Sequence, residues 1–333
     1  MNKTGIKWTE LTSNPIYFVD KDGTPRRQHH CEKVSPGCAN CWAERVNLER
    51  FNGLPYDVPS TSMLKPVLNE SELEKWKRTK KEKMMFACSM TDLWGGFIPN
   101  DMRVKVYEAA ERSPLVTIQF LTKRAKECVD WVIDREYQQG VEQRPPENIW
   151  LGFSAENQKY FDERWGHFKR LARQRRVIVA SLEPLLGPIV LPDDFLALGQ
   201  RGQVIIGGES DDAVKIDDRT ARPMHPFWAR NIIRQCKDAG VPVLFKQWGQ
   251  WMPVSQVKSQ RNRLSDYCMV PLNGTKSIPS LYVRNADIEM LVEHANMIRV
   301  GRLIEGYDRF YGKEYAEYPC LIEQPTIQQS SLL

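Results

Sequence analysis

Short apolar runs, rich in β-branched and aromatic residues, alternate with amphipathic segments along most of this chain. Runs of this length and composition predict strands that are buried on both faces, as the strands of a parallel sheet are. The expected strands are Met84–Ser89, Val116–Leu121, Ile149–Ser154, Val177–Leu182, Val204–Gly208 and Val243–Gln247.

The segments between these runs have a helical period. After Asn100, a suitable cap, apolar residues recur every three or four positions, and the same spacing returns within 125–132 and 161–172. A last helix is expected between Pro226, near its start, and Gly240, just past its end. Strands joined by single helices imply parallel pairing with right-handed crossovers. The pattern therefore predicts an α/β fold, a full or partial TIM-like (β/α) barrel, with the doubly wound open sheet as the alternative.

Polar residues collect where the predicted strands end. Because the active sites of (β/α) barrels lie at the carboxyl ends of the strands, we expect these residues to share one polar mouth. For Ser89, Thr122 and Ser154, helix capping is an equal alternative, since their side chains suit caps and turns. The catalytic candidates are Lys123, Glu183 and Lys246, and the cofactor-binding candidates are Ser89, Asp92, Ser154, Gly207, Gly208 and Glu209.

Three cysteines, Cys31, Cys38 and Cys41, stand within one short segment, and a Pro-Gly pair forces a turn between the first two. This spacing predicts one metal site with the three thiolates as ligands. A structural zinc site normally has four protein ligands, whereas three thiolates on a four-iron cluster leave one iron open to another molecule. The alternatives are a zinc site completed by His29 or His30, and unrelated buried thiols.

The composition permits a nucleic-acid partner without demanding one. The 47 basic and 42 acidic residues leave a net charge of +5, which is a mild excess. Two basic runs, Lys75–Lys83 around Trp76 and Lys169–Arg176, can grip a phosphate backbone, although such runs are more often solvated helix faces. No run is long and apolar enough to span a bilayer, and the eight cysteines show no disulfide framework. A reducing cytoplasm is therefore expected, without a membrane partner.

Two further segments lie outside the βα repeat. Residues 17–30, with a turn signal at Asp20–Gly23, predict a hairpin inserted before the cysteine loop, and His29 and His30 are placed on its surface. The barrel is expected to cover residues 1–253. Residues 254–333 predict a C-terminal appendage that is loop-like over 254–280, helical over Asp287–Met297 and frayed after Pro319.

A series of motifs runs in order along the chain around the cysteine loop. They are Trp8-Thr9-Glu10, Asn14-Pro15, Ser89-Met90-Thr91-Asp92-Leu93, Leu121-Thr122-Lys123-Arg124, Trp150-Leu151-Gly152-Phe153-Ser154-Ala155-Glu156-Asn157, Glu183-Pro184-Leu185-Leu186-Gly187-Pro188, Gly207-Gly208-Glu209-Ser210, Arg222-Pro223-Met224-His225-Pro226 and Phe245-Lys246-Gln247-Trp248-Gly249. With the cysteine triad, these motifs resemble a phage and prophage family of three-cysteine proteins of unknown function. That family is similar to radical S-adenosylmethionine (SAM) enzymes, since both place a cysteine triad before a βα barrel.

The resemblance implies a barrel of the radical SAM type, with a 4Fe-4S cluster on the three cysteines and SAM on the open iron. Gly207, Gly208 and Glu209 would be similar to the motif that receives the SAM amino group. Electrons from an external donor would convert SAM to a 5′-deoxyadenosyl radical for modification or repair, with a nucleic-acid base as the first substrate candidate, in the cytoplasm of a bacterial host. The alternative function is a non-catalytic phage protein that binds nucleic acid and is stapled by zinc or a cluster.

Overall fold

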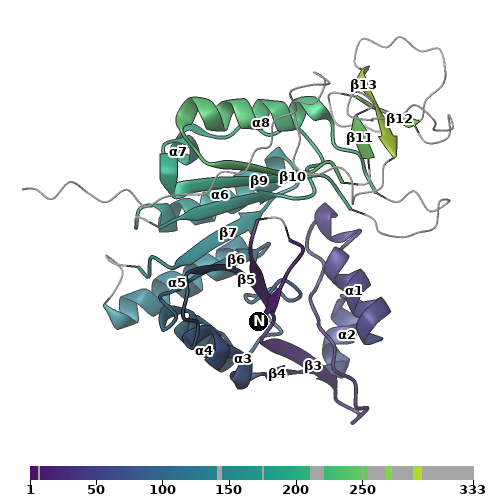
Figure 1. Cartoon of the computed structure of the whole chain (residues 1–333). Helices are drawn as coiled ribbons and strands as arrows, with labels where there is room; N and C mark the ends of the chain where they lie inside the picture. The colour runs from purple at the N-terminus through teal and green to yellow at the C-terminus, as the bar shows by residue number, and fades with distance from the viewer. Residues whose placement is uncertain are drawn as a thin grey trace, which may run out of the picture.

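One eight-stranded sheet forms the body of the protein (Figure 1). The structure, a computed structural model, describes residues 1–6, 8–140, 145–174, 176–210 and 221–249, and beyond these the backbone of three short strands at 251–253, 267–271 and 288–294. The strands lie across the sheet in the order β1 (Asn2–Lys3), β2 (Leu11–Ser13), β5 (Lys83–Ala87), β6 (Val116–Thr122), β7 (Ile149–Ser154), β8 (Ile178–Leu182), β9 (Gly202–Gly207) and β10 (Val243–Gln247).

The order and direction of these strands decide between the two predicted architectures. Only β1 pairs antiparallel with its neighbour, and β2 and β5 to β10 are all parallel. A doubly wound sheet reverses its strand order at a switch point, whereas here the order follows the chain. The doubly wound alternative is therefore wrong. The sheet is curled but ends at β1 and β10, so the partial TIM-like barrel is confirmed (Figure 1).

Helices cover the outer face of the curled sheet (Figure 1). The order along the chain is α3 (Glu70–Lys77), α4 (Asn100–Glu111), α5 (Ala125–Gln139), α6 (Gln158–Ala172), α7 (Asp193–Leu196) and α8 (Pro226–Ala239), with a 3₁₀ turn η2 (Gly199–Arg201) before β9. Apolar side chains fill both faces of the strands: Phe153 packs against Phe161 under α6, while Trp150 belongs to an inner cluster with Val179 and Ile205. Burial on both faces explains why the six predicted strands are continuous apolar runs.

The cysteine segment and the two short helices after it stand on the other side of the molecule (Figure 1). They are η1 (Pro36–Cys38), α1 (Trp42–Phe51) and α2 (Val58–Met63). Ahead of them, β3 (Ile16–Asp20) forms a two-stranded antiparallel sheet with β4 (Leu64–Leu68). Of the predicted hairpin of residues 17–30, the structure has one antiparallel bridge between Phe18 and Gln28, while β4 pairs with β3 along its length.

The C-terminal strands correct one sequence prediction. Part of the segment expected to be a helix over Asp287–Met297 is strand β13 (Ile288–His294), which lies between β11 (Trp251–Pro253) and β12 (Tyr267–Pro271). The segment contains alternating Ile288, Met290 and Val292, a spacing that suits a strand, and antiparallel pairing on both sides overrides its helical period. The predicted tail after Pro319 lies outside the described residues, and the boundary at residue 253 stays a prediction.

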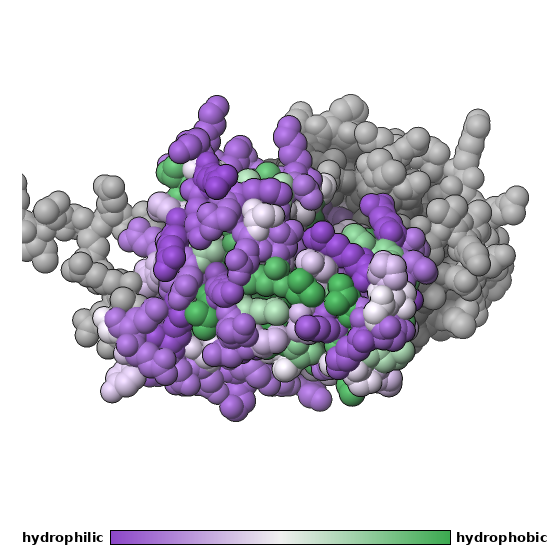
Figure 2. Space-filling view, turned by 90° about the horizontal axis from the view of Figure 1, so that it is seen from below, coloured by the Kyte–Doolittle hydropathy of each residue, from purple (hydrophilic) through white to green (hydrophobic). Residues whose placement is uncertain are grey.

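Viewed from the side of β3 and β4, the described surface is mostly hydrophilic, with an apolar strip near the middle (Figure 2). Among the described residues, none of the helices combines the length and the hydrophobicity that a membrane span requires.

Acid is expected to loosen the start of α8. His225 is 1% exposed, and its Nδ1 accepts a hydrogen bond from the backbone N–H of Phe227 at 3.1 Å, which caps the helix. Burial lowers the pKa of His225 from 6.5 to about 4, so the unfolded state binds more protons between these two values. The stabilisation is therefore present above pH 6.5 and lost as the pH falls toward 4.

The variant His225→Asn keeps a capping acceptor but does not titrate. Urea unfolding at a series of pH values through this window should show that the free energy of unfolding falls less on acidification in the variant than in the wild type. An identical pH dependence in both proteins would show that His225 is not the responsible group.

Candidate metal and cofactor site

A cavity of about 500 Å³ opens at the carboxyl ends of the strands. Its wall contains residues at or just after the ends of β5, β6, β7, β8, β9 and β10, together with the cysteine loop. The structure thus brings together nine of the twelve predicted site residues, namely Cys31, Cys38, Cys41, Ser89, Asp92, Lys123, Ser154, Glu183 and Lys246. Parallel strands make this possible, because their carboxyl ends meet at one edge of the sheet.

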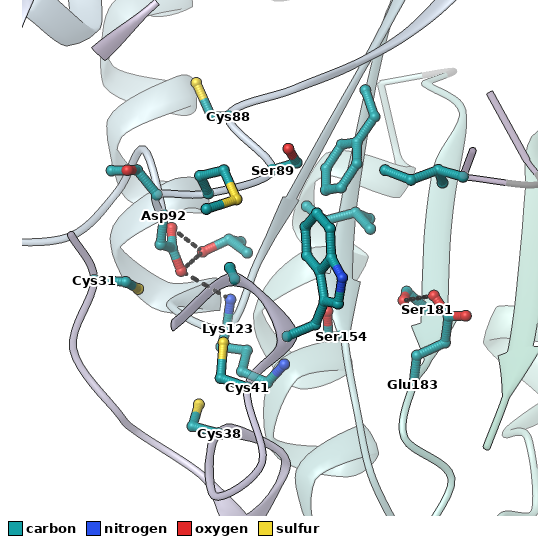
Figure 3. A pocket seen from close by; sticks show the side chains of 18 of the residues that line it. Cys31, Cys38, Cys41, Cys88, Ser89, Asp92, Lys123, Ser154, Ser181 and Glu183 are labelled. Carbon is teal, nitrogen blue, oxygen red and sulfur yellow. Dashed lines mark hydrogen bonds between the residues drawn. The ribbon is translucent and has the colours of Figure 1, made fainter. Parts of the chain in front are cut away.

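The three cysteines lie on the same side of this cavity (Figure 3). Burial raises the pKa of Cys31 to about 12 and also raises that of Cys41, so without a cation these thiols stay protonated at neutral pH. No three His, Cys, Asp or Glu side chains among the described residues are already gathered around one metal position. The donor set nevertheless fits a thiolate-bound metal, because a cation in the cavity would stabilise the ionised sulfurs and draw them together.

The two histidines before the loop do not complete such a site. His30 is fully buried, its Nε2 lies 2.7 Å from Thr61 Oγ1, and its ring packs edge-on against Phe97. His29 is 8% exposed and packs against Phe51. Their predicted surface position is wrong, because β3, α1 and the Phe97 segment cover them. Neither lines the cavity, so the structure gives the zinc alternative no fourth ligand from these two residues.

The buried carboxylate of Glu156 contacts the turn of the cysteine loop at Ser35 and Gly37. Glu156 is fully buried, and its Oε1 accepts a hydrogen bond of 2.6 Å from Ser35 Oγ. Arg164 donates to its Oε2 at 3.2 Å, and Lys123 Nζ lies 3.6 Å from Oε1. A side chain at Gly37 would overlap the carboxylate, which explains the glycine in the turn. Glu156 therefore fixes the loop between the first and second cysteines.

A second carboxylate holds the loop from the side of β9. Glu209 Oε2 accepts hydrogen bonds from Asn40 Nδ2 at 3.0 Å and from the backbone N–H of Arg222 at 2.7 Å. The Arg222 guanidinium also bonds Glu209 and donates to the carbonyl of Pro36 at 2.9 Å. Glu209 is thus fully occupied in joining the segment at 222 to the cysteine loop.

The glycines before Glu209 also have a packing role. A side chain on Gly208 would overlap the carbonyl of Trp248, and one on Gly207 would touch the Glu183 carboxylate. Gly207, Gly208 and Glu209 are not part of the described cavity wall. The structure therefore gives these three residues contacts within the protein, and their part in SAM binding stays a prediction.

Asp92 organises the end of β6 next to the first cysteine. Its carboxylate accepts two hydrogen bonds from Thr122 Oγ1, at 2.8 and 2.9 Å, and one from the backbone N–H of Lys123 at 3.1 Å (Figure 3). Arg124 Nη1 lies 3.3 Å from Asp92 Oδ2. The same guanidinium donates to Cys31 Sγ at 3.9 Å and to the Glu32 carbonyl at 3.3 Å. Asp92 thereby orients Arg124, which holds the start of the loop.

The remaining candidates form the other side of the cavity. Glu183 and Ser181 lie across from the cysteines in Figure 3. Lys246 Nζ is 3.0 Å from Glu183 Oε1, and Ser181 Oγ donates to Glu183 Oε2 at 3.3 Å. Ser89, whose Oγ accepts from Asn14 Nδ2 at 3.1 Å, sits nearer the amino-terminal strands. The cavity therefore has two chemically distinct walls, one with the three cysteines and one with the Glu183–Lys246 ion pair.

Of the first predicted basic run, Lys75 and Lys77 lie on α3, whereas Lys83 begins β5. Lys75, Lys77 and Lys83 each pair with a nearby carboxylate. Trp76 is fully buried and donates its indole N–H to Ser13 Oγ at 2.8 Å, so it cannot stack on a base. In the second run, Arg176 is buried against Glu136. These runs give no support to a phosphate-binding surface.

A three-cysteine loop held at the carboxyl edge of a curled parallel sheet defines a class of cysteine-loop (β/α) half-barrel proteins. Within that class, the chain belongs to the DUF5131 family, described as "Protein of unknown function", whose model matches residues 3–318. The expected family of unknown function is confirmed to this extent, and a phage or prophage origin stays a prediction. No curated protein matches the chain.

Among solved structures, the chain is similar to mutants of spore photoproduct lyase. A single-site mutant has 12% sequence identity and a TM-score of 0.44, covering 73% of this chain and 78% of that one. A double mutant with bound AdoMet and dinucleoside spore photoproduct has 11% identity and a TM-score of 0.39, covering 88% and 70%. At this sequence identity and TM-score, the similarity concerns the course of the backbone and not the activity.

Proposed function

We propose that this protein is an iron-sulfur enzyme of the radical SAM type that modifies or repairs a nucleic-acid base. The observation that supports it is the placement of three cysteines from one loop on the wall of a cavity at the carboxyl ends of a half-barrel. In this proposal the three thiolates hold a 4Fe-4S cluster with one open iron. When bound, the cluster would supply an electron that cleaves SAM to a 5′-deoxyadenosyl radical.

The chain's own residues then have separate tasks. Glu156, Glu209 and Arg124 hold the cysteine loop in place through the contacts described above. Lys123 contributes positive charge near Cys41, which favours the ionised thiol. Ser89 and Ser154 remain the proposed cofactor contacts, since both line the cavity. Glu183 and Lys246 remain the proposed contacts to the substrate on the opposite wall.

The test is cleavage of SAM by the anaerobically reconstituted protein. After chemical reduction, the protein should release 5′-deoxyadenosine and methionine from SAM. S-adenosylhomocysteine, which lacks the sulfonium, is the matched control and should remain intact. A reduced cluster that leaves SAM uncleaved would contradict the enzyme and favour the non-catalytic, cluster-stapled protein. An oxygen-sensitive cluster also agrees with the cytoplasm of a bacterial host as the expected location.

A further inference from the structure

Every cationic side chain on the described cavity wall is already paired with a carboxylate. The pairs, with their nitrogen to oxygen distances, are Lys246 and Glu183 (3.0 Å), Lys123 and Glu156 (3.6 Å), and Arg124 and Asp92 (3.3 Å). Phosphate recognition relies on cationic or amide donors that are free to turn to the phosphate. Each described cation on this wall has a carboxylate beside it that would repel a phosphate, whereas a neutral group can use the N–H donors that the pairing leaves over.

Another part of the same cavity wall is aromatic and apolar. Trp8 is 2% exposed, lines the cavity and packs against Phe86 with ring centroids 4.7 Å apart. Leu121 continues the same wall. The indole N–H of Trp8 is buried and has no hydrogen-bond partner among the described residues. A ring that carries a hydrogen-bond acceptor suits this wall, because it would satisfy the buried indole N–H of Trp8.

The ion pair adds a hydrogen-bond pattern to this apolar wall. Glu183 presents only acceptors and Lys246 only donors, and their charged atoms lie side by side. Both side chains line the cavity and are 16% and 23% exposed, but Glu183 Oε1 beside Lys246 is itself buried, so a ligand would meet the carboxylate at Oε2. Ser181 donates to Glu183 Oε2 and thereby fixes the orientation of the carboxylate. The complement of this pair is a neutral edge with an N–H beside a carbonyl or ring nitrogen, which is the edge of a nucleobase.

From these three features we infer that Trp8, Glu183 and Lys246 form a nucleobase pocket, in which the substrate base is read while its sugar and phosphates stay outside the cavity. This inference rests on the proposed function, since it names the substrate side of the same site. It assigns Glu183 and Lys246 to base recognition, with the carboxylate accepting from the base N–H and the ammonium donating to its neighbouring acceptor.

Binding of free nucleosides to the full-length, anaerobically reconstituted protein tests the pocket without any turnover. The probes are the four deoxynucleosides, with 2-deoxyribose 5-phosphate as the control without a base, and the readouts are tryptophan fluorescence and saturation-transfer NMR. At least one nucleoside should bind, and the sugar phosphate should not. The variants Glu183→Gln and Lys246→Met should each weaken nucleoside binding at least tenfold. Glu74→Gln, which breaks the exposed ion pair with Lys77, is the matched control and should bind as the wild type does.

Other results of the binding experiment would overturn the pocket. Binding of the sugar phosphate, or no nucleoside binding, would show that the wall does not read bases. Weakened SAM binding with unchanged nucleoside binding in Glu183→Gln would assign the wall to the cofactor's adenine. The iron content and SAM cleavage of the same samples are measured separately. Nucleoside binding without iron would reject the radical mechanism alone, and SAM cleavage without nucleoside binding would reject the pocket alone.

Discussion

A Cys38→Ala variant purified without oxygen is expected to lose its iron and its brown colour. Cys38 lies in the middle of the cysteine loop, and its side chain lines the cavity with Cys31 and Cys41. A four-iron cluster left with two thiolates has two open irons and is readily lost. We expect iron to fall from about four atoms per chain to below about one, and SAM cleavage to disappear with it.

The control for this variant is Cys128→Ala. Cys128 is fully buried in α5 and does not line the cavity. Its replacement removes a core thiol at a cost of about 1 kcal/mol but no proposed ligand. Iron and sulfide analysis of both variants separates the two effects. Equal iron in Cys38→Ala and the wild type would remove Cys38 from the ligand set.

Replacement of Glu156 by alanine is expected to lower the free energy of unfolding by about 3–5 kcal/mol, because one partner of a buried ion pair is removed. Arg164, with a side chain 3% exposed, would keep its charge in the core without a carboxylate. The same change releases Ser35, so the cysteine loop should also load iron less completely. Urea unfolding of the iron-free protein measures the first effect, and iron content after reconstitution measures the second.

Two matched variants show which property of Glu156 is needed. Glu156→Gln keeps the volume and an acceptor for Ser35 but removes the charge, so it should retain more iron than the alanine variant. Glu70→Ala breaks the exposed pair with Lys105, and such pairs contribute about 0–1 kcal/mol. If Glu156→Ala were no less stable than Glu70→Ala, the buried carboxylate would not be the anchor of the loop.

Local pattern was enough to predict the strands and the shared mouth. Strands β7, β8 and β9 are buried at every residue, and this produces apolar runs that stand out in the sequence. Parallel pairing then places the residues after each strand at one edge, which is why Glu183 and Lys246 meet across an interval of the chain that contains α8.

The anchors of the cysteine loop had no comparable signal. Ser35 and Glu156 are 121 positions apart, Asn40 and Glu209 are 169 apart, and the Pro36 carbonyl and Arg222 are 186 apart. Each anchor is a tertiary contact that leaves no periodicity in the sequence. Glu156 follows the end of β7, where its sequence does not distinguish a loop anchor from other polar residues. The glycines at 207–208 suggest a ligand, because close packing and ligand approach both require the absence of a side chain.

The errors have the same origin. His29 and His30 are buried by β3, α1 and Phe97, which come from separate parts of the chain. Strand β13 acquires its conformation from two neighbouring strands, although its sequence also supports a helix. In both places tertiary contacts override a local preference that was correctly recognised.

The central claim is that three thiolates hold a cluster and leave one iron open. The most direct measurement is metal and acid-labile sulfide analysis of the wild-type protein purified and handled without oxygen. We predict about four iron and about four sulfide per chain with no stoichiometric zinc. One zinc per chain without sulfide would contradict the claim and assign the cysteine loop to a structural metal site.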